Sequence, residues 1–275
     1  MASEIVKYEQ PLSAPLRKQE NARMLLLSHQ ARLGDHLARA ADVGVEEIVS
    51  TAITEIATAE PAVRDKLMLC TGQSVLKAVA DACRYGLVFG KVLGQAYLIP
   101  RKDQCCLDVG YRGYEALVYR SGAVKALQSG IVFEGDEFDY EIGRQPPIRH
   151  RPKLDAKHTT DKIVAVYVQA HLDVNLAIAE VMNREDVCRI AARSRRRVSL
   201  YDTEPEMWRK APIKRIAKHL PLSPSYRTLL DEIILREEGL NEAQAGPGEE
   251  VLEGEARARF CLEGVQSPEP VKEKP

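Results

Sequence analysis

The spacing of apolar residues changes twice along this chain, and these changes restrict the folds that it can adopt. Up to Gly86 apolar residues recur with the period of a helix. From Gly94 to Met182 they mostly alternate with polar residues, as in half-buried strands, and after Met182 the helical period returns. Because short turns join most of the alternating runs, their strands should pair antiparallel. The sequence predicts an α+β fold, an antiparallel sheet with packed helices and flexible terminal segments.

Three helices carry local signals. Residues 16–41 show a helical pattern. Its predicted apolar stripe is Met24, Leu27, Leu33 and Leu37. The clearest helix is predicted over 71–86, with Thr71 as the N-cap and Gly86 at the left-handed position after the last turn. Residues 205–220 form a third pattern, in which Pro212 predicts a kink or a fresh helix start.

Strands are predicted where polar and apolar residues alternate. The runs "GQAYLIP" and "QCCLDVG" flank the basic turn 101–103, which predicts a hairpin with a cationic tip. Four further alternating runs should complete the strands, and they lie at 124–134, 136–143, 162–172 and 175–182. The basic, Pro-rich segment 143–161 is predicted to be a long loop.

Length, hydropathy and cysteine content bound the class of protein. The 275 residues, 45% hydrophobic and 29% charged, can bury one sizeable core. Six cysteines without a C-x-x-C spacing indicate neither a disulfide framework nor a zinc site, and no apolar run is long enough to cross a bilayer. We expect a cytoplasmic protein. Its predicted parts are an N-terminal arm and candidate subunit contact (1–40), a core (41–238) and an acidic flexible tail (239–275).

Charge is unevenly distributed although the formal net charge is only −1. Residues 184–219 contain eleven Lys and Arg against five Asp and Glu, whereas residues 231–275 contain five against twelve. A single basic run is usually a solvated face, but clusters that recur on separate elements with tyrosines between them favour a groove that neutralises phosphates. The clusters are Arg101 and Lys102, Arg112, Arg149 and Arg151, Arg195, Arg196 and Arg197, and the lysine rail, which is Lys210, Lys214 and Lys218 at helical spacing.

Catalytic chemistry finds little support in the sequence. The segment 86–91 is one residue short of a phosphate loop, and Val92 replaces the required Ser or Thr. The acidic run 134–141 could supply carboxylates for a metal-dependent nuclease, with Asp136 and Asp139 as candidates, but its alternation is more typical of a solvated sheet face. We predict a protein that is not an enzyme and has no catalytic residue, metal or cofactor, with the nuclease as the alternative.

The segment Gly110-Tyr111-Arg112-Gly113 lies where a predicted strand gives way to a predicted helix. The free N–H groups of the first helical turn, together with the Arg112 guanidinium, could bind one phosphate. The glycines would either let a nucleic-acid backbone come close or only satisfy the dihedral angles of the turn. The sequence leaves both roles open.

Several segments, taken in order, resemble the RecT family of phage single-strand annealing proteins. They are "LGQAYLIP", "VGYRGYEALVYRSG", "VFEGDEFDYEIG", "HRP" and "PEMWRKAPIKRIAKHLPLS", and the resemblance covers about residues 45–225. It implies an α+β annealing core, ATP-independent binding and pairing of complementary single strands in homologous recombination, and a homo-oligomer in the form of a ring or helical filament.

The resemblance also implies partners, all within the cytoplasm of a bacterial host. They are single-stranded DNA, the annealed duplex, a companion exonuclease and, through the acidic tail, a host single-strand-binding protein, with no membrane. We predict that bound DNA follows a continuous basic groove with weak sequence preference. The residues predicted to line that groove are Gln95, Tyr97, Lys102, Tyr111, Arg112, Gly113, His150, Arg151, Arg195, Arg196, Arg197, Arg209, Lys210, Lys214, Arg215 and Lys218.

Overall fold

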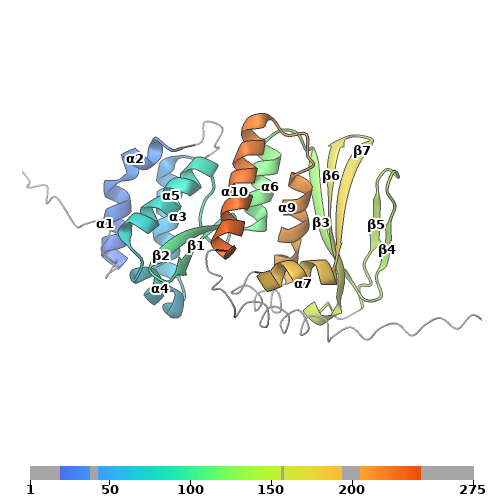
Figure 1. Ribbon diagram of the computed structural model, residues 1–275, viewed down its shortest axis with the longest axis horizontal. Coiled ribbons are helices and arrows are strands. Elements are labelled where there is room, and N and C mark those ends of the chain that lie inside the picture. Colours follow the sequence, from blue (N-terminus) through green and yellow to red (C-terminus); the bar gives the residue numbers. More distant parts are fainter. Residues whose placement is uncertain (1–18, 38–42, 156–157, 194–204, 243–275) are drawn as a thin grey trace, which may run out of the picture. The chain divides into compact units, whose positions relative to one another are not determined.

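The computed structural model describes residues 19–37, 43–155, 158–193 and 205–242 (Figure 1). The chain divides into two compact units, Met1–Arg120 and Ser121–Pro275. Among the described residues, no helix has both the length and the apolar character that a membrane crossing requires. The α+β class predicted from the sequence is confirmed, because small antiparallel sheets occur together with helices.

The first unit consists of helices around one hairpin. Its helices are α1 (Gln19–Ser28), α2 (Gln30–Gly34), α3 (Val45–Thr58), α4 (Pro61–Met68), α5 (Gly72–Tyr85) and α6 (Tyr111–Arg120). Helices α1 and α2 both pack against α3 and α5. The predicted caps of α5 are confirmed, since Thr71 Oγ1 accepts a hydrogen bond from Ser74 N at 3.3 Å and Gly86 adopts a φ of 62°.

The predicted apolar stripe of the first helical segment is partly wrong. Leu33 is buried, but Met24 and Leu27 are 47% and 43% exposed, and Ala22 and Leu26 are buried instead. The helical period fixes which residues share a face but not which face meets the neighbouring helices. The segment also divides into α1 and α2, so one stripe does not run through it.

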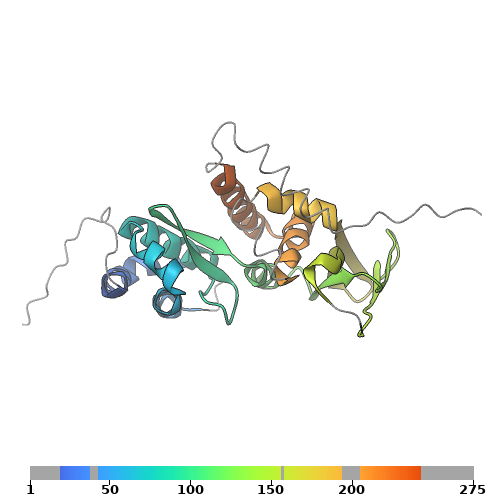
Figure 2. The ribbon, with the colours of Figure 1, turned by 90° about the horizontal axis from the view of Figure 1, so that it is seen from below.

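The predicted hairpin is confirmed. Strands β1 (Ala96–Arg101) and β2 (Gln104–Val109) pair antiparallel in the register Ala96 to Val109, and the tip residue Lys102 has a φ of 56°. Figure 2 shows this hairpin lying against α5. The hydrogen bond from Cys105 N to Ser74 Oγ, 2.9 Å long and buried, ties β2 to that helix.

The second unit is built on a three-stranded antiparallel sheet in the order β3-β6-β7, with a separate hairpin β4-β5. The strands are β3 (Ala126–Phe133), β4 (Glu137–Tyr140), β5 (Ile148–Arg151), β6 (Ile163–Asp173) and β7 (Leu176–Asn183). Four of them lie where alternation predicted strands. The prediction of a strandless loop over 143–161 is wrong, because Ile148–Arg151 pairs with β4 from within that segment.

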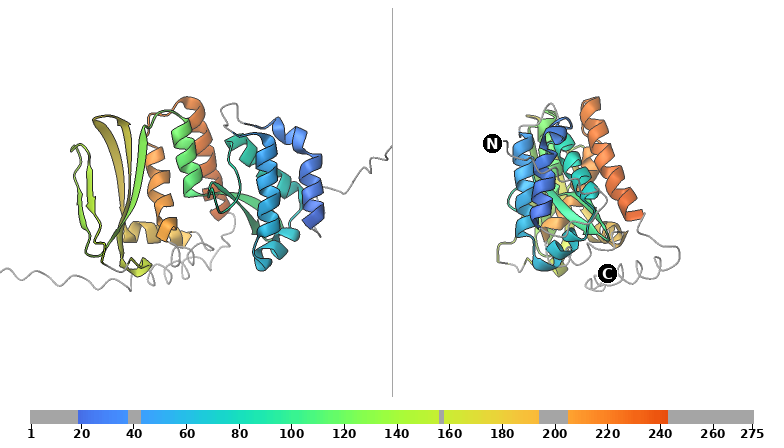
Figure 3. Two further views of the ribbon diagram at one scale, coloured as in Figure 1. Left: turned by 180° about the vertical axis from the view of Figure 1, so that it is seen from behind. Right: turned by 90° about the vertical axis from the view of Figure 1, so that its left-hand side faces the viewer.

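Helices pack on one face of the β3-β6-β7 sheet, and the β4-β5 hairpin packs on the other. Val166 of β6 belongs to a buried cluster with Met182 and Trp208, on the face covered by α7 (Arg184–Arg193), the 3-10 helix η2 (Pro205–Arg209) and α9 (Lys210–Ala217). The next residue, Tyr167, contacts the β4-β5 hairpin on the opposite face. Figures 1 and 3 show the sheet standing between that hairpin and α9.

The basic C-terminal segment starts a new helix close to its proline, as predicted. Helix α9 begins at Lys210, so Pro212 falls in the first turn, where its missing N–H costs nothing. Helix α10 (Pro224–Glu242) follows, and its Arg227 donates hydrogen bonds to the carbonyl oxygens of Ala217 and Lys218 at the end of α9. The remaining short element is the 3-10 helix η1 (Thr160–Lys162).

Candidate nucleic-acid interface

The most exposed concentration of predicted DNA-binding groups in the first unit is the Arg112 cluster, which is Arg112, Tyr111, Tyr97 and the loop 90–94. Arg112 Nε donates to the Tyr111 hydroxyl at 3.1 Å, and Nη1 donates to Val92 O at 3.2 Å. The guanidinium carbon also lies 5.8 Å from the centre of the Tyr111 ring. The Tyr111 hydroxyl, then the negative charge of Glu115, raise the pKa of Arg112 above its ordinary value, although slight desolvation opposes them.

Two of these side chains close over a glycine of the loop. A Cβ atom on Gly94 would lie 3.2 Å from Arg112 Cδ and 3.3 Å from the Tyr97 hydroxyl. Arg112 is exposed, and Nη2 forms no hydrogen bond with any described residue. Val92 beside it is 87% exposed. The cluster therefore offers a fixed cation, two aromatic rings and an exposed apolar side chain on one surface.

The glycines that flank Tyr111 and Arg112 have a packing role that the sequence did not indicate. A Cβ atom on Gly110 would lie 2.2 Å from Gly94 O, and one on Gly113 would lie 2.3 Å from Gln95 O. Neither residue has a positive φ. The start of α6 therefore needs glycine so that the chain at 94–95 can come close, and no positive φ requires it. Contact of Gly113 with DNA stays a prediction.

Two other residues of the first unit that were predicted to bind DNA, Gln95 and Lys102, have different surroundings. Gln95 Oε1 accepts a hydrogen bond from Val88 N at 3.3 Å, so this side chain holds the local backbone. Lys102 is exposed at the tip of the β1-β2 hairpin. Sequence reasoning also missed Arg120, whose guanidinium donates to Tyr85 O and Gly86 O and so fixes α6 to the end of α5.

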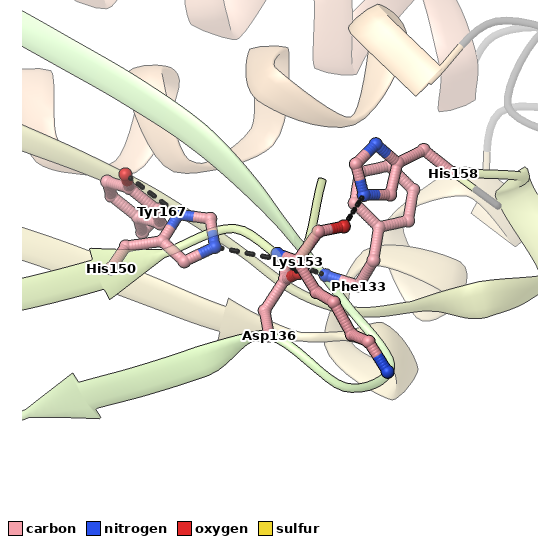
Figure 4. A network of polar contacts seen from close by, with 6 residues as sticks. All are labelled: Phe133, Asp136, His150, Lys153, His158 and Tyr167. Carbon is pink, nitrogen blue, oxygen red and sulfur yellow. Dashed lines mark hydrogen bonds and ion pairs between the residues drawn. The ribbon is translucent and has the colours of Figure 1, made fainter. Parts of the chain in front are cut away.

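His150, predicted to touch DNA, lies in a buried network in the second unit (Figure 4). Its Nε2 lies 3.0 Å from Asp136 Oδ2 and its Nδ1 lies 3.3 Å from the Tyr167 hydroxyl. Asp136 also accepts hydrogen bonds of 2.8 Å from Phe133 N and from Lys153 N. Burial favours the neutral form of Asp136, but the hydrogen bonds from Lys153, Phe133 and His150 together outweigh it and lower the pKa.

This network ties the start of β4 and the end of β5, which lie side by side, to the sheet. Because His150 and Asp136 are buried and satisfied by each other, the imidazole supports the strand and does not face solvent. The next residue, Arg151, does face solvent, and its Nη1 lies 3.7 Å from the exposed Glu137 carboxylate. Arg149 is exposed on the same strand. The hairpin thus carries cations on its outer side above a fixed base.

The lysine rail is not a uniformly exposed stripe. Lys210 is 3% exposed, and its Nζ lies 3.0 Å from Glu237 Oε1 on α10. Lys214 Nζ lies 3.0 Å from Oε2 of the same carboxylate, whereas Lys218 is exposed. An ammonium taken out of water needs a counter-charge, and α10 supplies it. The expectation of an exposed cation is wrong for Lys210, and DNA contact by Lys214 or Lys218 stays a prediction.

The two arginines of this basic segment also have partners. Arg209 donates to Ser129 O and Oγ on β3, and its Nε lies 2.7 Å from Glu206. Arg215 Nε lies 2.9 Å from Glu180 of β7, with about half of its side chain exposed. Arg209 therefore joins η2 to the sheet, while Arg215 keeps part of its surface open to solvent.

Within the second unit the predicted DNA-binding groups do not share one face. Arg151 belongs to the hairpin on one side of the β3-β6-β7 sheet, and Lys214, Arg215 and Lys218 belong to α9 or its end on the other side (Figure 3). A DNA strand that lies along one face of this sheet therefore cannot also contact the cations on the opposite face. The Arg195 to Arg197 triplet and the tail beyond residue 242 lie outside the described residues.

Comparison with known proteins now decides the family. The model of the RecT family matches residues 46–245. Protein RecT of Escherichia coli (strain K12) is 30% identical over 216 residues, which cover 74% of this chain and 77% of that protein.

This chain belongs to the RecT family.

The resemblance stated from the sequence motifs is thereby confirmed. RecT family proteins are single-strand annealing proteins of DNA recombination, which bind single-stranded DNA and are not catalytic. The matched region includes every residue predicted to bind DNA, while α1 and α2 precede it.

The nuclease alternative therefore loses its basis in this RecT family chain. Asp136 is a buried acceptor that holds backbone, and Asp139 pairs with Arg144 on the surface. Among the described residues no group of three or more His, Cys, Asp or Glu side chains is arranged to hold a metal ion. The acidic strand thus has a structural explanation.

Proposed function

We propose that this RecT family protein anneals complementary DNA strands without ATP by holding one strand on exposed cations with its bases free to pair. The Arg112 cluster is the primary contact. The observation that carries this assignment is the Arg112 guanidinium, which is exposed and fixed by Tyr111 and Val92 beside two aromatic rings. A guanidinium that is held in place loses less conformational freedom when it binds a phosphate.

The physical task is to overcome repulsion between two polyanions. Cations that neutralise phosphates release counterions, so affinity should fall steeply with salt. Aromatic side chains that stack on bases add affinity without reading sequence, because every base has a π-face. Tyr97 and Tyr111 serve this purpose, and contacts to phosphate and sugar leave the base edges available to the incoming strand.

Lys102, Arg151, Arg215 and Lys218 extend the contact surface. They are exposed, or half-exposed in the case of Arg215, and lie on separate elements. Since the cations of the second unit occupy two faces of one sheet, a continuous path for DNA requires neighbouring subunits in a ring or helical filament. Gln95, Gly113, His150, Arg209 and Lys210 act in this proposal as supports for the surface and not as contacts.

We also propose two protein partners. A companion exonuclease supplies the single strands, and the acidic tail recruits a host single-strand-binding protein. The tail is not needed for pairing purified strands. A protein truncated after residue 239 should therefore anneal oligonucleotides at the full-length rate and lose function only in cells.

The test measures annealing of two labelled complementary oligonucleotides by the full-length protein, without ATP, over a range of salt. Arg112→Ala should slow annealing and reduce the slope of log affinity against log salt by about 0.7, the value for one lost phosphate contact on a single strand. The control Arg189→Ala removes an exposed guanidinium that pairs with Glu185 on α7 and should leave both quantities unchanged. Equal behaviour of the two variants would refute the assignment.

A further inference from the structure

One carboxyl group in the first unit is buried without full compensation. Glu55 lies on α3, and its Oε1 accepts a hydrogen bond from Leu98 N at 3.0 Å. Its Oε2 is buried and has no hydrogen-bond partner among the described residues. Burial with few hydrogen-bond donors costs free energy for the ionised carboxylate and therefore favours the protonated form. Gly90 N–H also faces this carboxyl group.

Glu55 belongs to a set of side chains that fixes the backbone of residues 88–98. Thr51 lies one turn earlier on α3, and its Oγ1 accepts a hydrogen bond from Phe89 N at 3.2 Å. Gln95 Oε1 accepts from Val88 N at 3.3 Å. Two side chains of one helix and one of the segment itself thus satisfy backbone donors that the β1-β2 ladder leaves unused.

The same segment carries the loop of the Arg112 cluster. Gly94 N donates to Gly90 O at 2.9 Å and closes the loop, and Gly90 N donates to Ala96 O at 3.2 Å. Arg112 holds the middle of the loop through its bond to Val92 O. The backbone on either side of the loop is therefore held by α3 side chains, and the middle of the loop is held by the Arg112 guanidinium, to which we assign DNA binding.

The charge state of Glu55 is balanced near neutral pH. Burial raises the pKa of Glu55 to about 7, while the N–H groups of Leu98 and Gly90 and the Lys91 ammonium lower it. The charged or titratable groups that face it are Lys91 from the loop and the Cys105 thiol from β2. Both forms of the carboxyl group are thus populated under ordinary conditions.

We propose that Glu55 is a positioning residue of the DNA-binding surface and takes up a proton when single-stranded DNA binds. The inference rests on the proposed function, because it places phosphates at the Arg112 cluster. A phosphate there attracts the exposed Lys91 ammonium and so removes a charge that favours ionised Glu55. The phosphate charge also disfavours a second negative charge nearby. By linkage, the protonated protein binds single strands more tightly, and affinity rises as pH falls through neutrality.

The experiment compares full-length wild type, Glu55→Gln and Glu60→Gln. Glutamine at 55 keeps an oxygen for Leu98 N but carries no titratable proton. Glu60 is the matched control, since its exposed carboxylate lies 3.5 Å from Lys91 Nζ, and its removal changes charge at the same loop without touching the buried group. Fluorescence anisotropy with a labelled oligothymidylate gives the affinity between about pH 6 and about pH 8 at constant ionic strength.

Wild type and Glu60→Gln should gain about two- to threefold in affinity from about pH 8 to about pH 6, as a rise of about half a pKa unit on binding requires. Histidines contribute equally to all three proteins, so Glu55→Gln should show a correspondingly smaller pH dependence. Parallel profiles for wild type and Glu55→Gln would overturn this inference alone. No binding by wild type at any pH would overturn the proposed function as well.

A measurement on wild type keeps the inference testable if Glu55→Gln does not fold. Calorimetric titration with the oligothymidylate in buffers of different ionisation enthalpy counts the protons exchanged on binding. We expect net uptake of a fraction of a proton near neutral pH. An exchange of zero would contradict the coupling, whatever the affinity.

Discussion

Replacing Gly113 by alanine should both destabilise the first unit and weaken DNA binding. The new Cβ would lie 2.3 Å from Gln95 O and 2.7 Å from Val109 Cγ1, and the first of these is a backbone atom that cannot swing away. The start of α6 and the chain at 94–95 must therefore separate by about 1 Å to reach ordinary contact. That movement also strains the 2.9 Å hydrogen bond from Gly110 N to Gln95 O.

The size of the effect follows from three contributions. Overpacking costs about 1–3 kcal/mol, and weakening the Gly110 hydrogen bond costs about 1 kcal/mol. Alanine in a helix recovers about 1 kcal/mol relative to glycine. We expect the free energy of unfolding to fall by about 2 kcal/mol, and affinity for single strands to fall because Arg112 moves with α6.

Hydrogen exchange of peptides from residues 45–120 in a urea series measures this stability in the first unit alone. Gly34→Ala is the control, because a Cβ there would lie 3.7 Å from Val45 Cγ1, an ordinary contact. Its free energy of unfolding should equal that of wild type or rise by up to about 1 kcal/mol, because alanine is favoured over glycine in a helix. If Gly113→Ala behaves like the control, the close approach is not a constraint and the account of the glycines is wrong.

Two further predictions concern the second unit. Glu237→Gln leaves the buried Lys210 ammonium and the partly exposed Lys214 ammonium with a weaker partner, and it should cost about 3–5 kcal/mol, measured by urea unfolding with Trp208 fluorescence. Glu185→Gln, at an exposed pair, should cost under about 0.5 kcal/mol, and similar losses for the two variants would contradict the burial argument. The folded state lowers the pKa of Asp136 below its unfolded value, so its contribution to stability is present above that value and is lost as pH falls. Asp136→Asn should be less stable at neutral pH and flatten the acid side of the pH-stability curve, and an unchanged slope would show that the carboxylate contributes nothing.

Local signals were sufficient for part of the fold. The hairpin at 96–109 could be predicted because its alternation and its turn lie within a few residues of each other. The caps of α5 were predictable for the same reason. Strand β5 was missed because Ile148–Arg151 has only four residues and one apolar side chain, so its alternation of buried and exposed residues is not visible in the sequence. His150 is buried there through the network around Asp136. Such long-range support leaves no periodic pattern in the sequence.

In the candidate site, too, residues with a local sequence signal were predictable and residues that depend on long-range contacts were not. Arg112 and its tyrosines were identified because a basic residue between glycines at a strand-helix junction is a local pattern. The burial of Lys210 was not predictable, since its partner Glu237 lies 27 residues away on another helix. Glu55 was missed because one acid on an amphipathic helix looks like an ordinary solvated residue. Only the packing of the 88–98 segment against α3 gives that carboxyl group its role.

The location of bound DNA is the claim on which the rest depends. Photo-crosslinking of the full-length protein to single strands containing halogenated uracil, followed by mass spectrometry of the peptides, reads that location directly. We predict crosslinks to Tyr97 or Tyr111, lost in the presence of excess unlabelled strand and reduced in Arg112→Ala. Crosslinks confined to other segments, with Tyr97 and Tyr111 unmodified, would contradict the assignment.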